Sequence, residues 1–186
     1  MSRYKIHDPS GMYYMTMSVV GWIDIFSRQR YRDIVIDSLK YCQKEKGLIL
    51  HAYVIMTNHI HIVASPKHGF ILTDIVRDFK KFTAKTIWES IEKEPESRRE
   101  WLQYMFKYFG KHNVKEQIYQ IWTHDNHPIV LWSKSVIGQK INYIHQNPVR
   151  AGWVMYPEQY IYSSASNYRD EKGIIDVMIP EELFTL

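Results

Sequence analysis

The spacing of apolar residues changes between strand-like and helical periods along the first half of the chain. Residues 13–20 are rich in aromatic and β-branched side chains, which is typical of a strand. Residues 29–46 place apolar side chains at i, i+3 and i+4, which predicts an amphipathic helix, and Gly47 follows where a left-handed residue ends such helices. Two further apolar runs, 48–57 and 59–65, are separated by a short polar pair and predict an antiparallel hairpin.

Helical periodicity then dominates. Residues 73–92 carry one continuous apolar stripe and predict a long helix. Ser97 and Glu100 have the spacing of a capping box, which predicts that another helix begins there and that Gly110 closes it. Residues 118–123 read as a short strand.

A last helix is predicted near the C-terminal end. Ser133 or Ser135 can begin it, and Pro148 is expected to stop it, because proline cannot continue a helical hydrogen-bond ladder. Its apolar stripe consists of Ile137, Ile141 and Ile144.

The order of these elements predicts an α+β fold. Strand, helix, strand, strand, helix, additional helix and strand give the βαββαβ order of a ferredoxin-like antiparallel sheet with its helices on one face. The C-terminal helix is an addition to that core, and we expect residues 1–186 to form a single domain. Because this fold supports many activities, function has to be inferred from a site.

Composition narrows the class of protein. The chain has 186 residues, 45% of them hydrophobic, and a formal net charge of +4, which is compatible with a polyanionic partner. No apolar run reaches the roughly 18–20 residues of a membrane span. A single cysteine excludes an internal disulfide, and the polar start at residues 1–5 gives no secretion signal. We therefore expect a cytoplasmic protein with no membrane partner.

Two histidines alternate along the second strand of the predicted hairpin. His59 and His61 point to one side of the strand, and Ile60 and Ile62 point to the other. If the helices cover the isoleucine side, the histidines stand on the open face of the sheet. Two neutral imidazoles suit a divalent metal ion, usually with an oxygen ligand from elsewhere. A His-hydrophobe-His pair alone is more typical of solvent-facing strand histidines without a ligand, so a third group is needed.

The last predicted helix offers that group. Tyr143 and Asn147 are four residues apart and share a helix face, away from the isoleucine stripe. The amide oxygen of Asn147 could complete a metal site, and Gln146 is a competing candidate. The hydroxyl of Tyr143 becomes a usable nucleophile when a bound metal ion polarises the phosphate that it attacks.

Together the two motifs resemble those of the REP-associated tyrosine transposases, relatives of the single-tyrosine insertion-sequence transposases in the HUH superfamily. The motifs are Asn-His-Ile-His at 58–61 and Tyr-Ile-His-Gln-Asn-Pro-Val-Arg-Ala-Gly-Trp-Val at 143–154. The likeness spans nearly the whole chain, and the combination at this distance is far more specific than either motif alone.

The resemblance implies a complete activity. Mg²⁺ or Mn²⁺ would be held by His59, His61 and Asn147, with Gln146 left as an alternative because some relatives carry glutamine at the i+4 position. Tyr143 would attack a phosphodiester in single-stranded DNA beside a hairpin and form a 5′-phosphotyrosine link with a free 3′-OH. Family members are bacterial, so nucleoid association is expected. They include monomers and dimers, so a homodimer is one expected state.

Basic residues indicate where DNA could bind. Arg77, Lys81 and Lys85 line up at i+4 intervals on the long helix, and Arg150 follows the tyrosine motif. Contacts of these residues with phosphates would make binding depend on salt concentration. The stripe of three is equally compatible with an ordinary solvated helix face.

Two other functions compete with this interpretation. One is a non-catalytic module that binds single-stranded nucleic acid, but the 59–65 strand lacks the aromatics of RNA-recognition sheets. The other is a metal-dependent phosphodiesterase with water as nucleophile. Such an enzyme would usually place an acidic ligand or base next to the histidines, and the nearest downstream acidic residue is Asp74.

Overall fold

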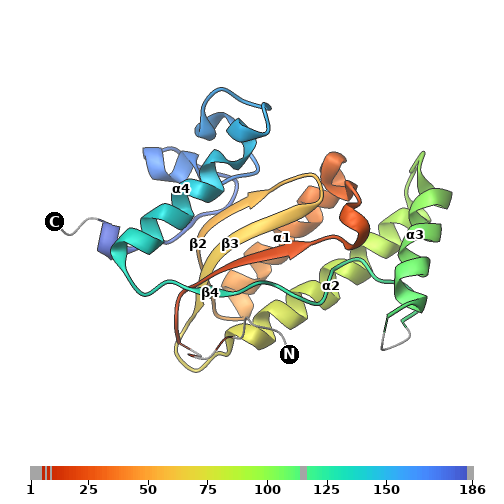
Figure 1. The fold of residues 1–186 in the computed structure, drawn as a ribbon, viewed down its shortest axis with the longest axis horizontal. Coiled ribbons are helices and arrows are strands. Elements are labelled where there is room, and N and C mark those ends of the chain that lie inside the picture. Colours follow the sequence, from red (N-terminus) through yellow and green to blue (C-terminus); the bar gives the residue numbers. More distant parts are fainter. Residues whose placement is uncertain (1–5, 7, 9, 114–116, 184–186) are drawn as a thin grey trace.

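A four-stranded antiparallel sheet forms the centre of the computed structural model, which describes residues 6, 8, 10–113 and 117–183. Its strands lie in the order β2-β3-β1-β4 (Figure 1). They are β1 (Tyr13–Ser18), β2 (Leu48–Ile55), β3 (His59–Pro66) and β4 (Ile129–Val130). This order and the antiparallel pairing confirm the predicted α+β, ferredoxin-like arrangement. That the whole chain forms one domain stays a prediction, and residues 1–5 lie outside the described part.

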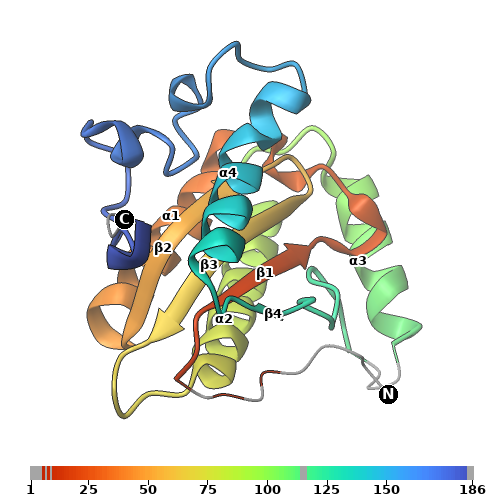
Figure 2. The same ribbon diagram turned by 60° about the vertical axis from the view of Figure 1, so that its left-hand side comes forward.

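Helices lie on both faces of the sheet. In Figure 2, α4 crosses in front of the strands, and α1 and α2 lie behind them. The helices are α1 (Gln29–Glu45), α2 (Leu72–Lys93), α3 (Arg99–Lys111) and α4 (Lys134–Arg150). Short 3-10 turns occur at Val20–Trp22, Ile25–Ser27, Pro157–Gln159, Ser166–Arg169 and Glu181–Leu183. No helix in the described part of the chain is long and apolar enough to cross a membrane.

Strand alternation divides the interior into two cores. Met17 is opposite Ile60 in the β1–β3 register, and both pack in the core shared with α1 and α2. On the other face, Val54 and Val63 pack against the isoleucine stripe of α4 (Ile137, Ile141 and Ile144). Fully burying one such side chain stabilises the fold by about 1.5–3 kcal/mol. The three isoleucines therefore hold α4 in one position on the sheet.

The histidine face of the sheet is therefore covered rather than open. His61 has only 4% of its surface exposed, and His59 is half-buried. The expectation of an open face was wrong, because the apolar side of α4 packs on Val54 of β2 and Val63 of β3, which lie on the same face of the sheet as the histidines.

The predicted strand at 118–123 is also corrected. In space this segment lies beside the residues just after β1, and its pairing is limited to one isolated antiparallel bridge, between Val19 and Trp122. Regular pairing begins only at β4, after His127, which has a φ of 43°, and Pro128, which has no N–H to donate. His127 and Pro128 thus separate the isolated bridge at Trp122 from the regular pairing of β4 with β1.

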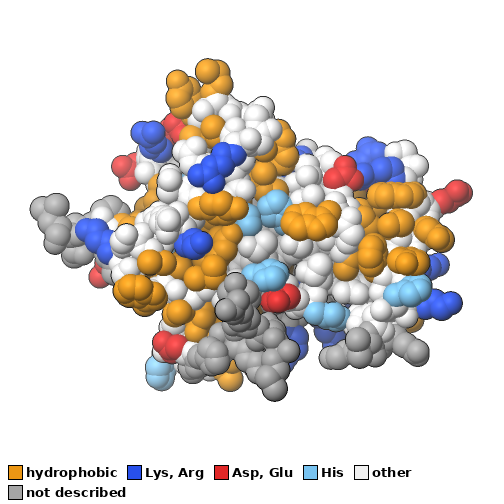
Figure 3. All heavy atoms as spheres, in the orientation of Figure 1, with side chains coloured by type: hydrophobic (Ala, Val, Ile, Leu, Met, Phe, Trp, Pro, Cys, Tyr) orange, Lys and Arg blue, Asp and Glu red, His pale blue; other side chains and the backbone are white. Residues whose placement is uncertain are grey.

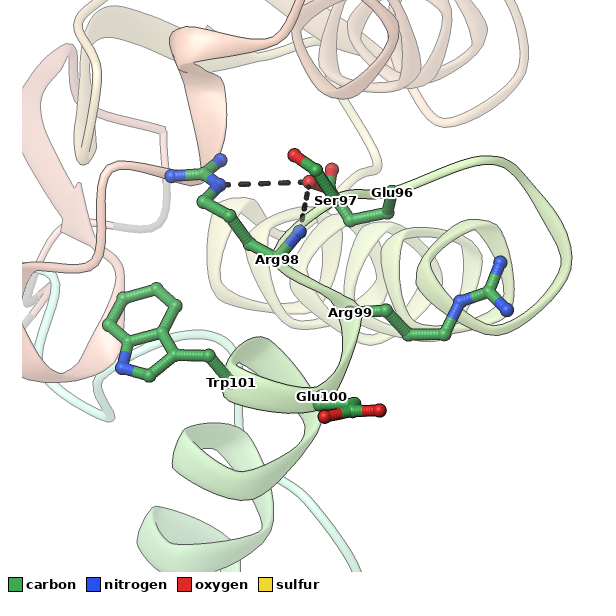
Figure 4. Close-up of a pocket in the computed structure, with 6 residues that line it drawn as sticks. All are labelled: Glu96, Ser97, Arg98, Arg99, Glu100 and Trp101. Carbon is green, nitrogen blue, oxygen red and sulfur yellow. Dashed lines mark hydrogen bonds and ion pairs between the residues drawn. The ribbon is translucent and has the colours of Figure 1, made fainter.

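Helix α3 begins without the predicted capping box. Its first residue is Arg99, and the side chain of Ser97 does not cap it. Glu96 instead accepts a hydrogen bond from the backbone N–H of Arg98 at 3.0 Å (Figure 4). The carboxylate of Glu96 is fully buried and also accepts from the guanidinium of Arg30 at 2.7 Å. The carboxylate of Glu96 therefore links the start of α3 to Arg30 of α1 through an ion pair and hydrogen bonds.

We expect Glu96→Gln to destabilise the fold by about 2–3 kcal/mol at pH 7, because it removes a buried charge among guanidinium groups. Burial opposes ionisation of Glu96. The N–H of Arg98, the hydroxyl of Tyr31 and the nearby guanidinium groups outweigh it and hold the pKa below its usual value. The stabilisation is therefore present above pH 4.5 and lost as the pH falls through the lowered folded-state pKa.

Urea unfolding between pH 3 and pH 7 checks this prediction. The exposed neighbour Glu100 provides the control, since Glu100→Gln should leave the free energy of unfolding almost unchanged. A Glu96→Gln penalty that does not shrink at acid pH would contradict the assigned charge effect.

Helix α4 begins and ends by different means. Ser133 is its N-cap and accepts from the N–H of Val136, which decides between the two predicted starts. Pro148 does not stop the helix, contrary to expectation, because it lies in the last turn and removes only one hydrogen bond. The helix closes at Gly152, which has a φ of 73°, and the N–H of Trp153 bonds back to the carbonyl of Pro148.

The outer edge of β2 is covered by the C-terminal segment. The N–H of Ile55 donates to the carbonyl of Tyr162, and the N–H of Ser164 donates to the carbonyl of Tyr53. Further along, the N–H of Met178 donates to the carbonyl of Leu50. The chain after α4 thus lies along the strand that would otherwise be a free edge.

Candidate functional site

Three rings from β3 and α4 meet between the sheet and the helix. The ring centroids of His59 and His61 are 4.7 Å apart, and the ring of Tyr143 lies 5.5 Å from that of His61. We call these three side chains the ring cluster. Figure 3 shows histidine side chains near the middle of this face of the molecule, with apolar side chains on both sides. The packing of α4 on its own sheet therefore brings together two motifs about 80 residues apart in one chain.

His61 is the most enclosed member of the cluster. Its Nδ1 atom lies 2.8 Å from the hydroxyl of Tyr14 and 2.8 Å from that of Thr16. Burial, aided by electrostatic repulsion from His59 and Lys140, lowers the pKa of His61 to about 3. The imidazole is thus neutral at physiological pH, which is the state that can ligate a metal ion.

His59 is oriented by its neighbour Asn58. The Nδ1 atom of His59 lies 2.6 Å from Oδ1 of Asn58, while Nδ2 of Asn58 donates to the carbonyl of Trp22. Since an amide oxygen only accepts, Nδ1 of His59 carries the ring proton. Burial also lowers the pKa of His59. Within the described residues, no hydrogen bond engages Nε2 of either His59 or His61.

Two cationic side chains border Tyr143. The guanidinium carbon of Arg150 lies 5.3 Å from the centre of the Tyr143 ring, and Nζ of Lys140 lies 6.0 Å from it. Lys140 also lies 4.9 Å from the ring of Tyr14. Tyr143 itself remains 36% exposed. Its surroundings combine access from solvent with positive charge, which favours an approaching phosphate.

Asn147 follows Tyr143 by one helical turn. Its Nδ2 atom donates to the backbone carbonyl of Tyr143 at 2.8 Å, which leaves Oδ1 as the free acceptor of that amide. Gln146, the competing candidate, is half-buried on the same helix. Across the described ranges, no three His, Cys, Asp or Glu side chains gather as a metal site. Among the described residues, side chains of another kind, such as these amides, are the candidates for a third protein ligand of the two histidines.

The basic stripe on α2 lies away from the ring cluster. Helix α2 packs on the opposite face of the sheet from α4. Arg77 forms ion pairs with Asp74 at 2.6 Å and Asp78 at 3.0 Å, and Lys85 lies 3.8 Å from a carboxylate of its own helix. Of the four predicted DNA contacts, only Arg150 lies at the cluster; a role for Arg77, Lys81 and Lys85 stays a prediction.

Several residues around the cluster were missed at the level of sequence. Tyr14 and Thr16 lie on β1, where the register places Thr16 opposite His61. The signal was present in the alternation of β1, whose polar positions share one face, but the pairing register was needed to use it. Lys140 precedes Tyr143 by three residues, one helical turn, and could have been found from that spacing.

Comparisons with known proteins agree with this picture. The family model described as "Transposase IS200 like" matches residues 16–124. A solved REP-associated tyrosine transposase bound to a REP hairpin shares 15% sequence identity, with a TM-score of 0.66 over 98% of this chain and 96% of that one. A solved protein from Deinococcus radiodurans R1, described as a "putative transposase", shares 14% identity, with a TM-score of 0.44 over 78% of this chain and 97% of that one. No curated protein matches.

The family match covers more than half of the chain, including β3 with both histidines, and ends before α4. The similarity of fold extends over nearly all of the chain. The protein belongs to the family of IS200-like transposases.

Proposed function

We propose that this transposase cleaves and rejoins single-stranded DNA with Tyr143 as its nucleophile. The observation that carries the proposal is the position of Tyr143, whose exposed ring lies 5.5 Å from a buried, neutral histidine of β3 and beneath the guanidinium of Arg150. A tyrosine placed between cations and candidate metal ligands suits attack on a phosphodiester.

The proposed reaction conserves the phosphodiester bond energy. The hydroxyl oxygen of Tyr143 attacks phosphorus, the bond from phosphorus to the 3′ oxygen breaks, and the DNA 5′ end becomes a phosphotyrosine. The proton lost by the hydroxyl is balanced by the proton that the leaving 3′ oxygen gains. Attack by another 3′-OH reverses the step and joins strands, so no high-energy cofactor is consumed. Arg150 would hold the phosphate beside the ring.

The donor groups of the cluster fit Mg²⁺ or Mn²⁺. His59 and His61 would ligate through Nε2, because Nδ1 of each ring is engaged by an oxygen, a pattern common among metal-bound histidines. Asn147, or in its place Gln146, would be the third ligand. When bound, the ion polarises the phosphate and stabilises the charge that develops on it. Because these ligands carry no negative charge, we expect tight binding only when a DNA phosphate completes the site.

A DNA hairpin is the proposed partner. Support comes from a protein of the same fold that has been solved bound to a REP hairpin. The cations at the ring cluster would face the cleaved strand, whereas Arg77, Lys81 and Lys85 could only contact DNA that reaches the other side of the sheet. A homodimer is not required for the cluster, since one chain supplies all its rings.

Labelled DNA tests the function directly. The protein is incubated with hairpin oligonucleotides labelled at either the 5′ or the 3′ end, in Mn²⁺ or in EDTA, and separated under denaturing conditions. We expect a metal-dependent protein–DNA adduct that carries only the 3′ label. An adduct carrying the 5′ label would contradict the polarity. Cleavage without an adduct would favour a phosphodiesterase that uses water, and binding without cleavage would favour a non-catalytic module.

A further inference from the structure

Trp22 is an exposed aromatic residue at the ring cluster. Its indole is 64% exposed, and its ring centre lies 5.9 Å from that of His59 in an edge-to-face contact. Trp22 and Tyr143 therefore lie at opposite ends of one row of rings, with His59 and His61 between them. The indole of Trp22 is thus accessible to a ligand that approaches the candidate metal ligands.

The backbone holds Trp22 in an unfavoured conformation. Its φ is 55°, in the left-handed region that bulky residues rarely adopt, and Gly21 before it has a φ of 60°. A side chain at Gly21 would place its Cβ 2.6 Å from the ring of Phe109 on α3, so this contact and the positive φ both favour glycine. Strain of this kind persists where the surrounding structure imposes it, and it is concentrated at functional sites.

Asn58 ties this turn to the candidate metal site. One amide group donates to the carbonyl of Trp22 at 3.3 Å and accepts from Nδ1 of His59 at 2.6 Å. The position of the indole is thus coupled to the orientation of the histidine.

The chemistry of the row suggests what Trp22 binds. Positive charge from Arg150 and Lys140 lies at the Tyr143 end, which suits the phosphate, and the uncharged indole lies at the other end. In a single strand the bases are unpaired, and each presents a flat face that stacks on an aromatic side chain. Resting on the function proposed above, we propose that Trp22 stacks on an unpaired base next to the scissile phosphate and so fixes which phosphodiester faces Tyr143.

A scan with abasic nucleotides tests this inference. Trp22→Ala, Trp22→Phe and the unmodified protein are given oligonucleotides that lack one base at each position in turn around the cleaved bond, and the rate of adduct formation is measured. On intact DNA we expect Trp22→Ala to lose about 10- to 100-fold in rate, as befits one stacked base, and Trp22→Phe to retain most of it. At one abasic position the unmodified protein should slow to the rate of Trp22→Ala, and the substitution should then cost nothing more.

Trp132→Ala provides the matched control, because that indole is 78% exposed just before α4. The Trp132→Ala variant should form the adduct at the same rate as the unmodified protein on every substrate. Thermal unfolding should give similar midpoints for all variants, as their side chains are exposed.

The outcomes are separable. If the unmodified protein forms the adduct but Trp22→Ala cleaves intact DNA equally well, the stacking role is wrong. The stacking role is also overturned if Trp22→Ala lowers the rate by the same factor on every abasic substrate, since a uniform loss would indicate a structural effect. If no adduct forms with the unmodified protein, the proposed function fails, and this inference fails with it.

Discussion

Tyr143→Phe should abolish the covalent protein–DNA adduct while leaving DNA binding intact. The substitution removes one oxygen, the proposed nucleophile, and keeps the ring that contacts His61 and Arg150. Among the described residues, Tyr14 is the tyrosine whose ring contacts that of Tyr143, and it is a poor substitute because burial raises its pKa to about 12. Denaturing gels measure the adduct, and fluorescence anisotropy with a hairpin oligonucleotide measures binding.

Tyr156→Phe is the control for this prediction. Tyr156 is 57% exposed and follows α4, so its loss should change neither adduct nor affinity. An adduct that persists in Tyr143→Phe would assign the nucleophile to another residue. A loss of both adduct and binding would indicate that Tyr143 contacts DNA without reacting.

His61→Ala is expected to reduce metal-stimulated adduct formation by about a thousand-fold. Removing one of two imidazoles takes away the charge stabilisation that the ion would give the transition state, and about 4 kcal/mol corresponds to that factor. His59→Ala should act in the same direction. The measurement is the adduct rate as a function of Mn²⁺ concentration. Mn²⁺ binding is measured separately in a Tyr143→Phe background, in which DNA can complete the site without being cleaved.

Two further variants separate ligation from folding. His51→Ala removes a buried histidine that bonds to Ser65 and Met178, so it should lower the unfolding temperature without altering the response to Mn²⁺. Tyr14→Phe removes a hydroxyl that orients His61 and should weaken Mn²⁺ binding by about 10- to 100-fold. Unchanged Mn²⁺ binding in both His59→Ala and His61→Ala would refute the proposed metal site.

Much of the fold could be predicted because local patterns and the global structure agree. The helix that ends before Gly47 and the hairpin of 48–65 follow from periodicity alone. The fourth strand could not be located, because β4 has only two residues and its pairing depends on the edge of β1. The cap of α3 was misplaced for a similar reason, since the buried carboxylate of Glu96 is satisfied by arginines distant in sequence.

The site was predictable in its parts but not in its surroundings. Strand and helix periods correctly placed His59 with His61 and Tyr143 with Asn147, since each pair lies within one element. Contacts between elements could not be predicted from these periods. The burial of His61, its hydrogen bond with Tyr14 and the packing of α4 over the histidine face all depend on the tertiary structure. Trp22 is the extreme case, because its positive φ arises from a turn held under α3 and cannot be read from residue type.

The C-terminal segment along β2 limits how copies of this chain can meet. An uncovered edge strand is a template on which a second molecule can continue the sheet. Here the hydrogen-bonding groups of Leu50, Tyr53 and Ile55 are already used by residues 162–178, and the opposite edge offers only the two residues of β4. Two copies therefore cannot merge their sheets along β2. The ring cluster itself is built from β3 and α4 of a single chain.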